Sequence, residues 1–145
     1  MILVDVNILI YASIPTLQQH LAAQEWLDRQ LNASAPVGMP WITVLAYLRL
    51  VTNARIFRPP VAMATAWQRV SAWLARDVVW MPAPTERHGQ VLGSLLAQPG
   101  VIGNLVTDAH LAALAIEHGL TLCSTDGDFA RFSGLRWLNP LTPAP

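Results

Sequence analysis

Three aspartates stand at positions where a parallel sheet would bring acidic side chains together. Asp5 directly follows an apolar run that suits a buried strand, and Asp126 follows a later run of the same kind. Asp108 stands at the start of a helical pattern that precedes this later run. Reactive groups in open parallel sheets gather beyond the carboxyl ends of the strands, so these carboxylates can meet although they are far apart in the sequence. Asp128, two residues after Asp126, can reach the same rim.

Such a group of carboxylates predicts a site for a hard divalent cation. Buried carboxylates that face one another raise each other's pKa values unless a cation relieves the repulsion. Mg²⁺ and Mn²⁺ prefer oxygen ligands and keep several waters, so about two to four carboxylates suffice. An ion of this kind generates hydroxide from a bound water and stabilises charge on phosphate oxygens, which is the chemistry of phosphodiester hydrolysis.

Each acid also has a purely structural alternative. Asp5 can cap a turn after its strand, and Asp108 can be a first-turn carboxylate that the helix dipole stabilises. Asp126-Gly127-Asp128 can form a turn, and for Asp128 the favoured interpretation is the N-cap of the following helix. The coincidence of all these positions favours the metal site.

Alternating strand and helix patterns place these acids. The predicted strands are 1–4, 78–81, 120–124 and 137–138. The predicted helices are 16–31 with Thr16 as its N-cap, 42–51, 61–74, 85–97, and 107–118 with Gly119 as its stop. Strands separated by helices indicate an α/β fold, in which helices flank a mostly parallel central sheet.

Length and composition narrow the class of protein further. We expect one domain at 1–140 and a flexible tail at 141–145. All nine basic residues are arginine, and the absence of lysine excludes a P-loop or a Schiff-base mechanism. Nine acidic residues balance the arginines, so any surface that binds nucleic acid must be a local stripe of positive charge. The single Cys123 excludes an internal disulfide. With no leader and no membrane-spanning segment expected, we place the protein in the cytoplasm.

Three motifs carry a resemblance that covers nearly the whole chain. They are the opening MILVDVNILIYA, the middle stretch PWITVLAYLRLVTN and the ending GNLVTDAHLAALAIEHGLTLCSTDGDFARF. With them the chain resembles a PIN-domain ribonuclease, and more closely the VapC toxins of VapBC toxin–antitoxin systems, in the subfamily abundant in mycobacteria. The last motif is the most specific of the three.

The resemblance implies a Rossmann-like α/β/α sandwich with an acidic site that uses Mg²⁺ or Mn²⁺ to cut RNA. By motif, Asp5 matches the first acid of the family, Asp108 the acid of its TDAH motif and Asp126 that of its S-x-D-x-D-F motif. These three would be both metal ligands and catalytic residues. Asp128 would be an auxiliary neighbour, oriented toward the site or capping the next helix.

The resemblance also implies supporting residues and partners. Asn7 and Thr125 would hydrogen-bond the metal ligands. The implied partners are an RNA substrate and a cognate VapB-type antitoxin, whose C-terminal tail occupies the groove near the acids. A homodimer is implied as well, for which the apolar helices at 42–51 and 61–74 offer surface.

One departure from the family pattern leaves an alternative open. Many PIN nucleases have a glutamate in the second helix, near 43–49, whereas this chain has no acid between Asp28 and Asp77. The gap suggests weaker metal binding, or one ion rather than two. It also motivates a non-enzymatic alternative, a PIN fold that binds RNA or antitoxin without cutting, against which the three retained acids argue. Glu25 and Glu86 are candidate substitutes, but their amphipathic helices favour solvent exposure.

A haloacid-dehalogenase-type phosphatase, which also begins with a strand ending in Asp, is a second enzyme class to consider. It needs an acid two residues later and a lysine, whereas this chain has Asn7 and no lysine. The sequence therefore excludes it.

Three arginines have two interpretations each. Arg49 is the only charge in an apolar helix and either contacts an RNA phosphate or pairs with an acid at the rim. Arg131 and Arg136 follow the acidic motif, and either bind backbone phosphates or are solvated surface side chains.

Overall fold

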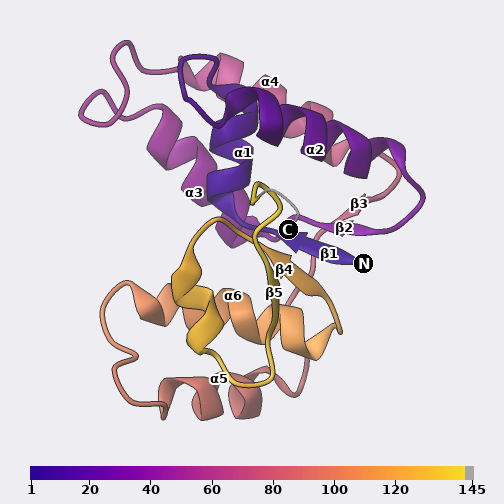
Figure 1. The fold of residues 1–145 in the computed structure, drawn as a ribbon, viewed down its shortest axis with the longest axis vertical. Coiled ribbons are helices and arrows are strands. Elements are labelled where there is room, and N and C mark those ends of the chain that lie inside the picture. Colours follow the sequence, from indigo (N-terminus) through magenta and orange to yellow (C-terminus); the bar gives the residue numbers. More distant parts are fainter. Residues whose placement is uncertain (143–145) are drawn as a thin grey trace.

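A computed structural model of the chain, which describes residues 1–142, places helices on both faces of one parallel sheet (Figure 1). The strands, in the spatial order β3-β2-β1-β4-β5, are β3 (Val79–Trp80), β2 (Val37–Gly38), β1 (Ile2–Val4), β4 (Thr121–Cys123) and β5 (Arg136–Leu138). Every neighbouring pair is parallel. The helices are α1 (Val6–Ser13), α2 (His20–Asn32), α3 (Trp41–Val51), α4 (Met63–Leu74), α5 (His88–Leu96), α6 (Leu105–Glu117) and the 3₁₀ helix η1 (Gly127–Arg131). The predicted α/β/α sandwich is confirmed.

The two central strands alternate their side chains between two cores. Leu3 of β1 pairs in register with Leu122 of β4, and both face the core formed with α5 and α6. Val4 and Cys123, one residue further along, pair in the same way and face the core formed with α1 to α4. Because helices cover both faces, residues 2–4 of β1 and 122–123 of β4 are apolar in succession rather than alternating with polar residues.

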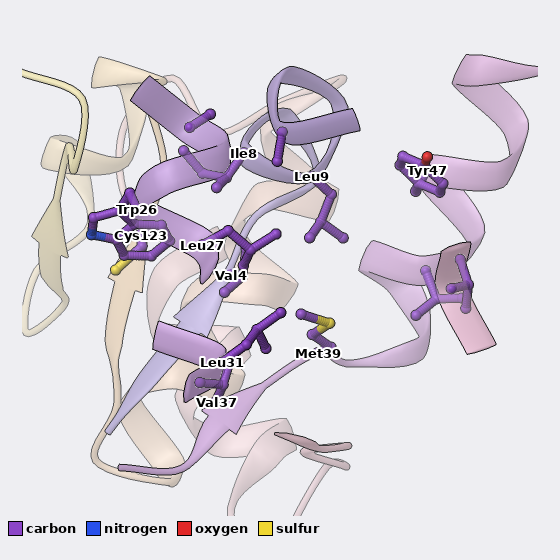
Figure 2. Close-up of a cluster of buried hydrophobic side chains, with 14 of the residues drawn as sticks. Val4, Ile8, Leu9, Trp26, Leu27, Leu31, Val37, Met39, Tyr47 and Cys123 are labelled. Carbon is purple, nitrogen blue, oxygen red and sulfur yellow. The ribbon is translucent and has the colours of Figure 1, made fainter. Parts of the chain in front are cut away.

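The core under α1 to α4 is the larger of the two (Figure 2). Ile8 of α1, Leu27 of α2 and Val37 of β2 are buried there together with Tyr47 of α3. The Tyr47 ring packs edge-on against Trp73 of α4, with their centroids 5.0 Å apart. The ring contact joins α3 to α4, while the Tyr47 hydroxyl donates to Oγ of Ser13 in α1 at 2.9 Å, and together they hold α3 as one wall of the site described below.

Two elements differ from the sequence-based prediction at the start of the chain. Helix α1 was not predicted, because its continuous apolar run shows no helical periodicity; its residues Ile8 and Leu9 are fully buried. Thr16 is not a helix cap: α2 begins at His20, after turns in which the N–H of Leu17 donates to the carbonyl of Ile14. Leu17 still contacts the larger core from this turn.

Strand β2 was also missed, because its two residues, one of them glycine, lie between Pro36 and Pro40 and resemble a loop. Gly38 is required there by close packing, since an added Cβ would lie 2.8 Å from Cγ of Pro82. The expected tail falls partly on residues 143–145, which lie outside the described residues, while Leu141 contacts the larger core. None of the helices within residues 1–142 has both the length and the hydrophobicity that a bilayer span requires.

Candidate active site

Asp5 lies at the carboxyl end of β1 and caps α1. Its backbone N–H donates to the carbonyl oxygen of Cys123 at 3.0 Å, which ties it to β4. Oδ1 accepts from the N–H of Val6 at 2.7 Å, while Oδ2 accepts from the Ser124 hydroxyl at 2.7 Å and from Asn7 Nδ2 at 3.2 Å. Burial raises the pKa of Asp5, and the hydrogen bonds from Ser124 and Val6 oppose the rise. The carboxylate is thus held in one orientation.

Ser124 is the centre of the hydrogen bonds behind the acids, and the sequence analysis did not single it out. Its side chain is fully buried, and its Oγ accepts from Asn7 Nδ2 at 2.9 Å and from the N–H of Asp126 at 3.0 Å while donating to Asp5. The N–H of Thr125 donates to Oδ1 of Asn7 at 3.3 Å. Asn7 therefore contacts an acid directly. Thr125 contacts Asn7 instead, through its backbone N–H. The serine of the S-x-D-x-D-F motif was the signal that could have indicated Ser124.

Asp108 lies in the first turn of α6 and faces the other acids. Its pKa is raised from 3.8 to about 6, first by burial and then by the negative charges of Asp5, Asp126 and Asp128. The positive charge of Arg131 opposes this rise. Carboxylates from three separate segments therefore share one electrostatic environment.

Asp126 follows β4 and caps η1, with its Oδ1 accepting from the N–H of Asp128 at 2.9 Å. The expectation that Asp128 is the cap of this helix is therefore wrong by two residues. The side chain of Asp128 is exposed and lies 3.5 Å from Nη2 of Arg131. Asp126 therefore caps η1 and also lines the groove that is described next.

An open groove of about 770 Å³ runs between α3 and the beginning of α6. Asp5, Asp108 and Asp126 are among its lining residues. The strand order reverses between β1 and β4, and the crevice at such a switch point is the usual ligand site of an open parallel sheet. The α3 wall consists of Ile42, Thr43, Leu45, Ala46, Arg49 and Leu50. The wall therefore has no acid where many PIN nucleases have a glutamate, and Glu25 and Glu86 are both exposed and outside the groove lining.

The three arginines with two possible interpretations, Arg49, Arg131 and Arg136, lie in different surroundings. Arg49 is exposed on the groove wall and has no acidic partner among the described residues. Arg131 lies beside Asp128. Arg136 donates from Nη2 to the carbonyl of Gly119, which precedes β4 at the opposite edge of the sheet from the acids. The hypothesis that Arg136 holds a phosphate beside the acids is therefore wrong.

The acids suit a partly hydrated cation better than a closed metal cage. Within residues 1–142, no three His, Cys, Asp or Glu side chains converge tightly enough to hold a metal ion by themselves. Mg²⁺ keeps several waters and is usually bound through one or two carboxylates, so it does not need such a cage. The hard oxygen donors and the raised pKa of Asp108 fit an ion of this kind.

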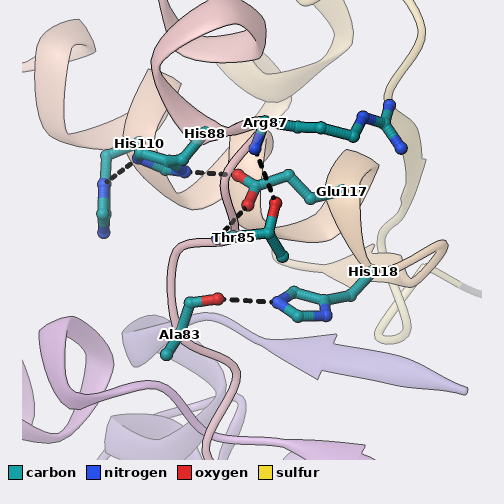
Figure 3. A network of polar contacts seen from close by, with 7 residues as sticks. All are labelled: Ala83, Thr85, Arg87, His88, His110, Glu117 and His118. Atoms are coloured by element: carbon teal, nitrogen blue, oxygen red, sulfur yellow. Dashed lines mark hydrogen bonds and ion pairs between the residues drawn. The ribbon is translucent and has the colours of Figure 1, made fainter.

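A polar network fastens α6, and so Asp108, to the segment before it (Figure 3). The buried carboxylate of Glu117 accepts from the N–H of Thr85 at 2.7 Å and pairs with Nδ1 of His88, whose Nε2 lies 3.0 Å from Nδ1 of His110. Burial tends to raise the pKa of Glu117, but the hydrogen bonds from Thr85 and His88 lower it below its usual value. The ring of His118 hydrogen-bonds the carbonyl of Ala83 at 2.8 Å and adds a second connection between the end of α6 and this segment.

Comparison with known proteins gives a consistent result over the whole chain. Residues 2–135 match the family model of the PIN domain. The chain is 41% identical over 138 residues to Ribonuclease VapC37 of Mycobacterium tuberculosis (strain ATCC 25618 / H37Rv), an alignment that covers 95% of this chain and 96% of the relative.

Solved structures show the same fold at lower sequence identity. The crystal structure of Mycobacterium tuberculosis VapC20, a toxin that cleaves the sarcin-ricin loop, superposes with a TM-score of 0.67 at 18% identity and covers 94% of this chain and 99% of that chain. VapBC2 from Rickettsia felis, bound to a DNA fragment from its promoter, gives a TM-score of 0.69 at 21% identity and covers 96% of this chain and 98% of that chain.

Proposed function

The chain belongs to the PIN-domain family and, within it, to the VapC ribonuclease toxins of toxin–antitoxin systems, and on this premise we propose that it hydrolyses phosphodiester bonds in cytoplasmic RNA as an endoribonuclease. The observation that carries the proposal is that Asp5, Asp108 and Asp126 line one groove although they come from three distant segments. The raised pKa of Asp108, caused first by burial and then by the charges of Asp5 and Asp126, supports the grouping of these carboxylates.

We assign Asp5, Asp108 and Asp126 as the residues that would hold a Mg²⁺ or Mn²⁺ ion. When bound, such an ion supplies a polarised water for attack on phosphorus and a positive charge for the phosphate oxygens. Asp5 is already oriented by Ser124 and Asn7, so its carboxylate needs no rearrangement to act as a ligand. Oδ2 accepts two hydrogen bonds and Oδ1 only the one from Val6, so a lone pair of Oδ1 remains for the ion.

The groove walls supply contacts for an RNA strand. Arg49 is exposed on the α3 wall without an acidic partner among the described residues, so its guanidinium is free to bind a backbone phosphate. Asn104 and Thr107 line the α6 side and offer hydrogen bonds to phosphate or sugar. Because the net charge is zero, this local contact rather than a general attraction would hold the RNA.

A cognate VapB-type antitoxin is the proposed protein partner, and its C-terminal tail would occupy this groove. Exposed apolar side chains stand on both sides: Trp41 and Leu45 on α3, and Ile102 and Val106 at the beginning of α6. Apolar residues exposed around a polar centre are typical of protein-binding surfaces. A tail lying there would cover the acids and block the RNA.

A homodimer is proposed through a different surface. Met63 and Trp67 are exposed one turn apart on α4, and Ile56 is exposed in the preceding loop. We expect the protein freed of antitoxin to have twice the monomer mass by light scattering, and Trp67→Glu to have the monomer mass.

The alternative function, binding of RNA or antitoxin without cleavage, rests on the apolar α3 wall that lacks a glutamate. It differs from the proposal in one measurable respect, because it predicts RNA binding with no products under any divalent ion.

Cleavage of total cellular RNA by the purified, antitoxin-free protein tests the proposal. Discrete products should form with Mg²⁺ or Mn²⁺ and disappear with EDTA, and they should be absent for Asp5→Asn and Asp108→Asn. Asp77→Asn, an exposed acid outside the groove, is the matched control and should cut normally. Folded protein without activity under any of these ions would favour the alternative, and activity surviving both substitutions would place the site elsewhere.

A further inference from the structure

Arg131, the last residue of η1, stands beside the acids without lining the groove. Its Nη2 lies 3.5 Å from Oδ1 of Asp128, one turn earlier in η1. Its backbone carbonyl accepts from Gln98 at 2.9 Å, with the Gln98 amide in the orientation that also lets it accept from the N–H of Ser133. Both ends of the residue are therefore restrained, by η1 and by the segment between α5 and α6.

Gly100, in the loop between α5 and α6, lies near the Arg131 side chain. It has a φ of +80°, which favours glycine, and a Cβ added there would be in ordinary van der Waals contact with Nη1 of Arg131, at 3.7 Å. The loop that leads into α6 thus passes directly by the guanidinium.

The contacts of Arg131 connect it to the acidic site. Its guanidinium contacts Asp128, whose backbone N–H donates to Oδ1 of the groove residue Asp126 at 2.9 Å. The Arg131 side chain remains 39% exposed, and a guanidinium has five N–H donors, of which the contact with Asp128 engages one. The remaining donors are available to a ligand in front of the acids.

We propose, on the basis of the proposed function, that Arg131 binds an RNA backbone phosphate next to the acids and that Asp128 is its positioning residue rather than a metal ligand. Asp128 is 56% exposed, contributes no atom to the groove lining and contacts the guanidinium instead. A carboxylate in this position holds the guanidinium near the acids until a phosphate, which can bind it through two parallel hydrogen bonds, takes its place.

The salt dependence of RNA binding measures the phosphate contact directly. It is measured with single-stranded RNA in EDTA, on an Asp5→Asn background that should bind without cutting. Loss of one phosphate contact lowers the slope of log K against log salt by about 0.7 for a single strand. We expect this decrease for Arg131→Ala and for Arg131→Gln, which keeps the aliphatic stem, whereas Arg131→Lys should keep the slope and bind more weakly.

Arg29→Ala is the matched control. Arg29 is exposed in the last turn of α2, which leads to the beginning of β2 at the other edge of the sheet. Its removal should leave the slope unchanged. An unchanged slope in both Arg131→Ala and Arg131→Gln would overturn the assignment of Arg131.

A second measurement distinguishes a positioning role for Asp128 from metal ligation. Asp128→Asn should weaken RNA binding but keep the full rise in melting temperature that Mg²⁺ produces, and adding Asp128→Asn to Arg131→Ala should weaken binding no further. Loss of the Mg²⁺-induced rise, as expected for Asp108→Asn, would make Asp128 a ligand and overturn its assignment. If the protein cuts RNA but the Arg131 variants keep their slope, this inference fails alone; if the Asp5→Asn protein binds no RNA, both it and the proposed function fail.

Discussion

The hydroxyl of Ser124 donates a hydrogen bond to Asp5 over a separation of 119 residues, at 2.7 Å. The same oxygen accepts from Asn7 and from the N–H of Asp126, so one buried atom connects the ends of β1 and β4 with both of their acids. The geometry of the site therefore depends on a residue that binds neither metal nor RNA in the proposed function.

Ser124→Ala is expected to lower the free energy of unfolding by about 1–3 kcal/mol, because it leaves buried polar groups of Asn7 and Asp126 without their partner. RNA cleavage should fall more than stability alone explains, since Asp5 loses its orientation. Urea unfolding measures the first effect. A cleavage assay, under conditions in which the variant and the wild type are both fully folded, measures the second. Thr125→Ala, which removes no described hydrogen bond, is the control; equal effects of the two substitutions would contradict this role of Ser124.

Asp108→Asn is expected to stabilise the metal-free protein at about neutral pH. The pKa of Asp108 is raised from 3.8 to about 6 in the folded state, so folding favours the protonated form. The stabilisation of the folded state by protonated Asp108 is complete below about pH 4 and is lost as the pH rises through about 6. In EDTA the variant should therefore melt above the wild type at about pH 7.5 and together with it near pH 4. A difference in melting temperature between variant and wild type that stays constant at all pH values would contradict the raised pKa of Asp108.

Mg²⁺ should raise the melting temperature of the wild type, because an ion that binds only the folded state stabilises it. Protonation of Asp108 competes with the ion, so the rise should decrease as the pH falls through about 6. Thermal unfolding with MgCl₂, against NaCl of equal ionic strength, measures the effect. Asp5→Asn and Asp108→Asn should abolish the rise, and its persistence in both would move the metal to other residues.

Glu117→Gln is expected to loosen α5 from α6 and to cost about 1–3 kcal/mol of stability, because it removes a charge from hydrogen bonds with Thr85 and His88. The lowered pKa of Glu117 means that its contribution is present above the ordinary value of 4.5 and fades as the pH falls. Hydrogen exchange should show faster opening of α5. Exposed Glu86 provides the control, since Glu86→Gln should leave exchange unchanged.

Arg49→Ala should weaken RNA binding without changing the effect of Mg²⁺ on the melting temperature. The guanidinium lies on the groove wall, has no acidic partner among the described residues and is not a metal ligand. A higher KM with a similar kcat is the expected kinetic result. An unchanged KM would mean that Arg49 is a solvated surface residue that does not bind RNA.

The acids could be placed from the sequence because a parallel sheet collects the ends of its strands at one edge. Asp5 directly follows β1 and Asp126 comes three residues after the end of β4, so strand prediction alone brought them together. The pairing of β1 with β4, by contrast, depends on packing across the whole sheet, so the sequence marks Ser124 as the serine of the S-x-D-x-D-F motif but does not reveal its hydrogen bonds. Ser124 is an uncharged residue next to a strand, which is common in cores without any functional role.

The missed elements have a common physical origin. Helix α1 is buried and β2 has two residues, so neither shows the periodicity by which amphipathic elements are identified. Both are stabilised by contacts with distant segments, as the closeness of Gly38 to Pro82 illustrates. The exact cap of η1 was missed for a similar reason, because Asp126 and Asp128 are equivalent by residue type and differ only in backbone geometry.

The central pairing of β1 with β4 also has a consequence for synthesis on the ribosome. A nascent chain that ends before residue 121 contains Asp5 and Asp108 but lacks β4, Ser124 and Asp126. The first acid then lacks β4 on one side of its strand, where only β2 remains as a neighbour, and it has no hydroxyl to orient it. Under the proposed function, the three acids can therefore line one groove only after β4 and Asp126 have been synthesised.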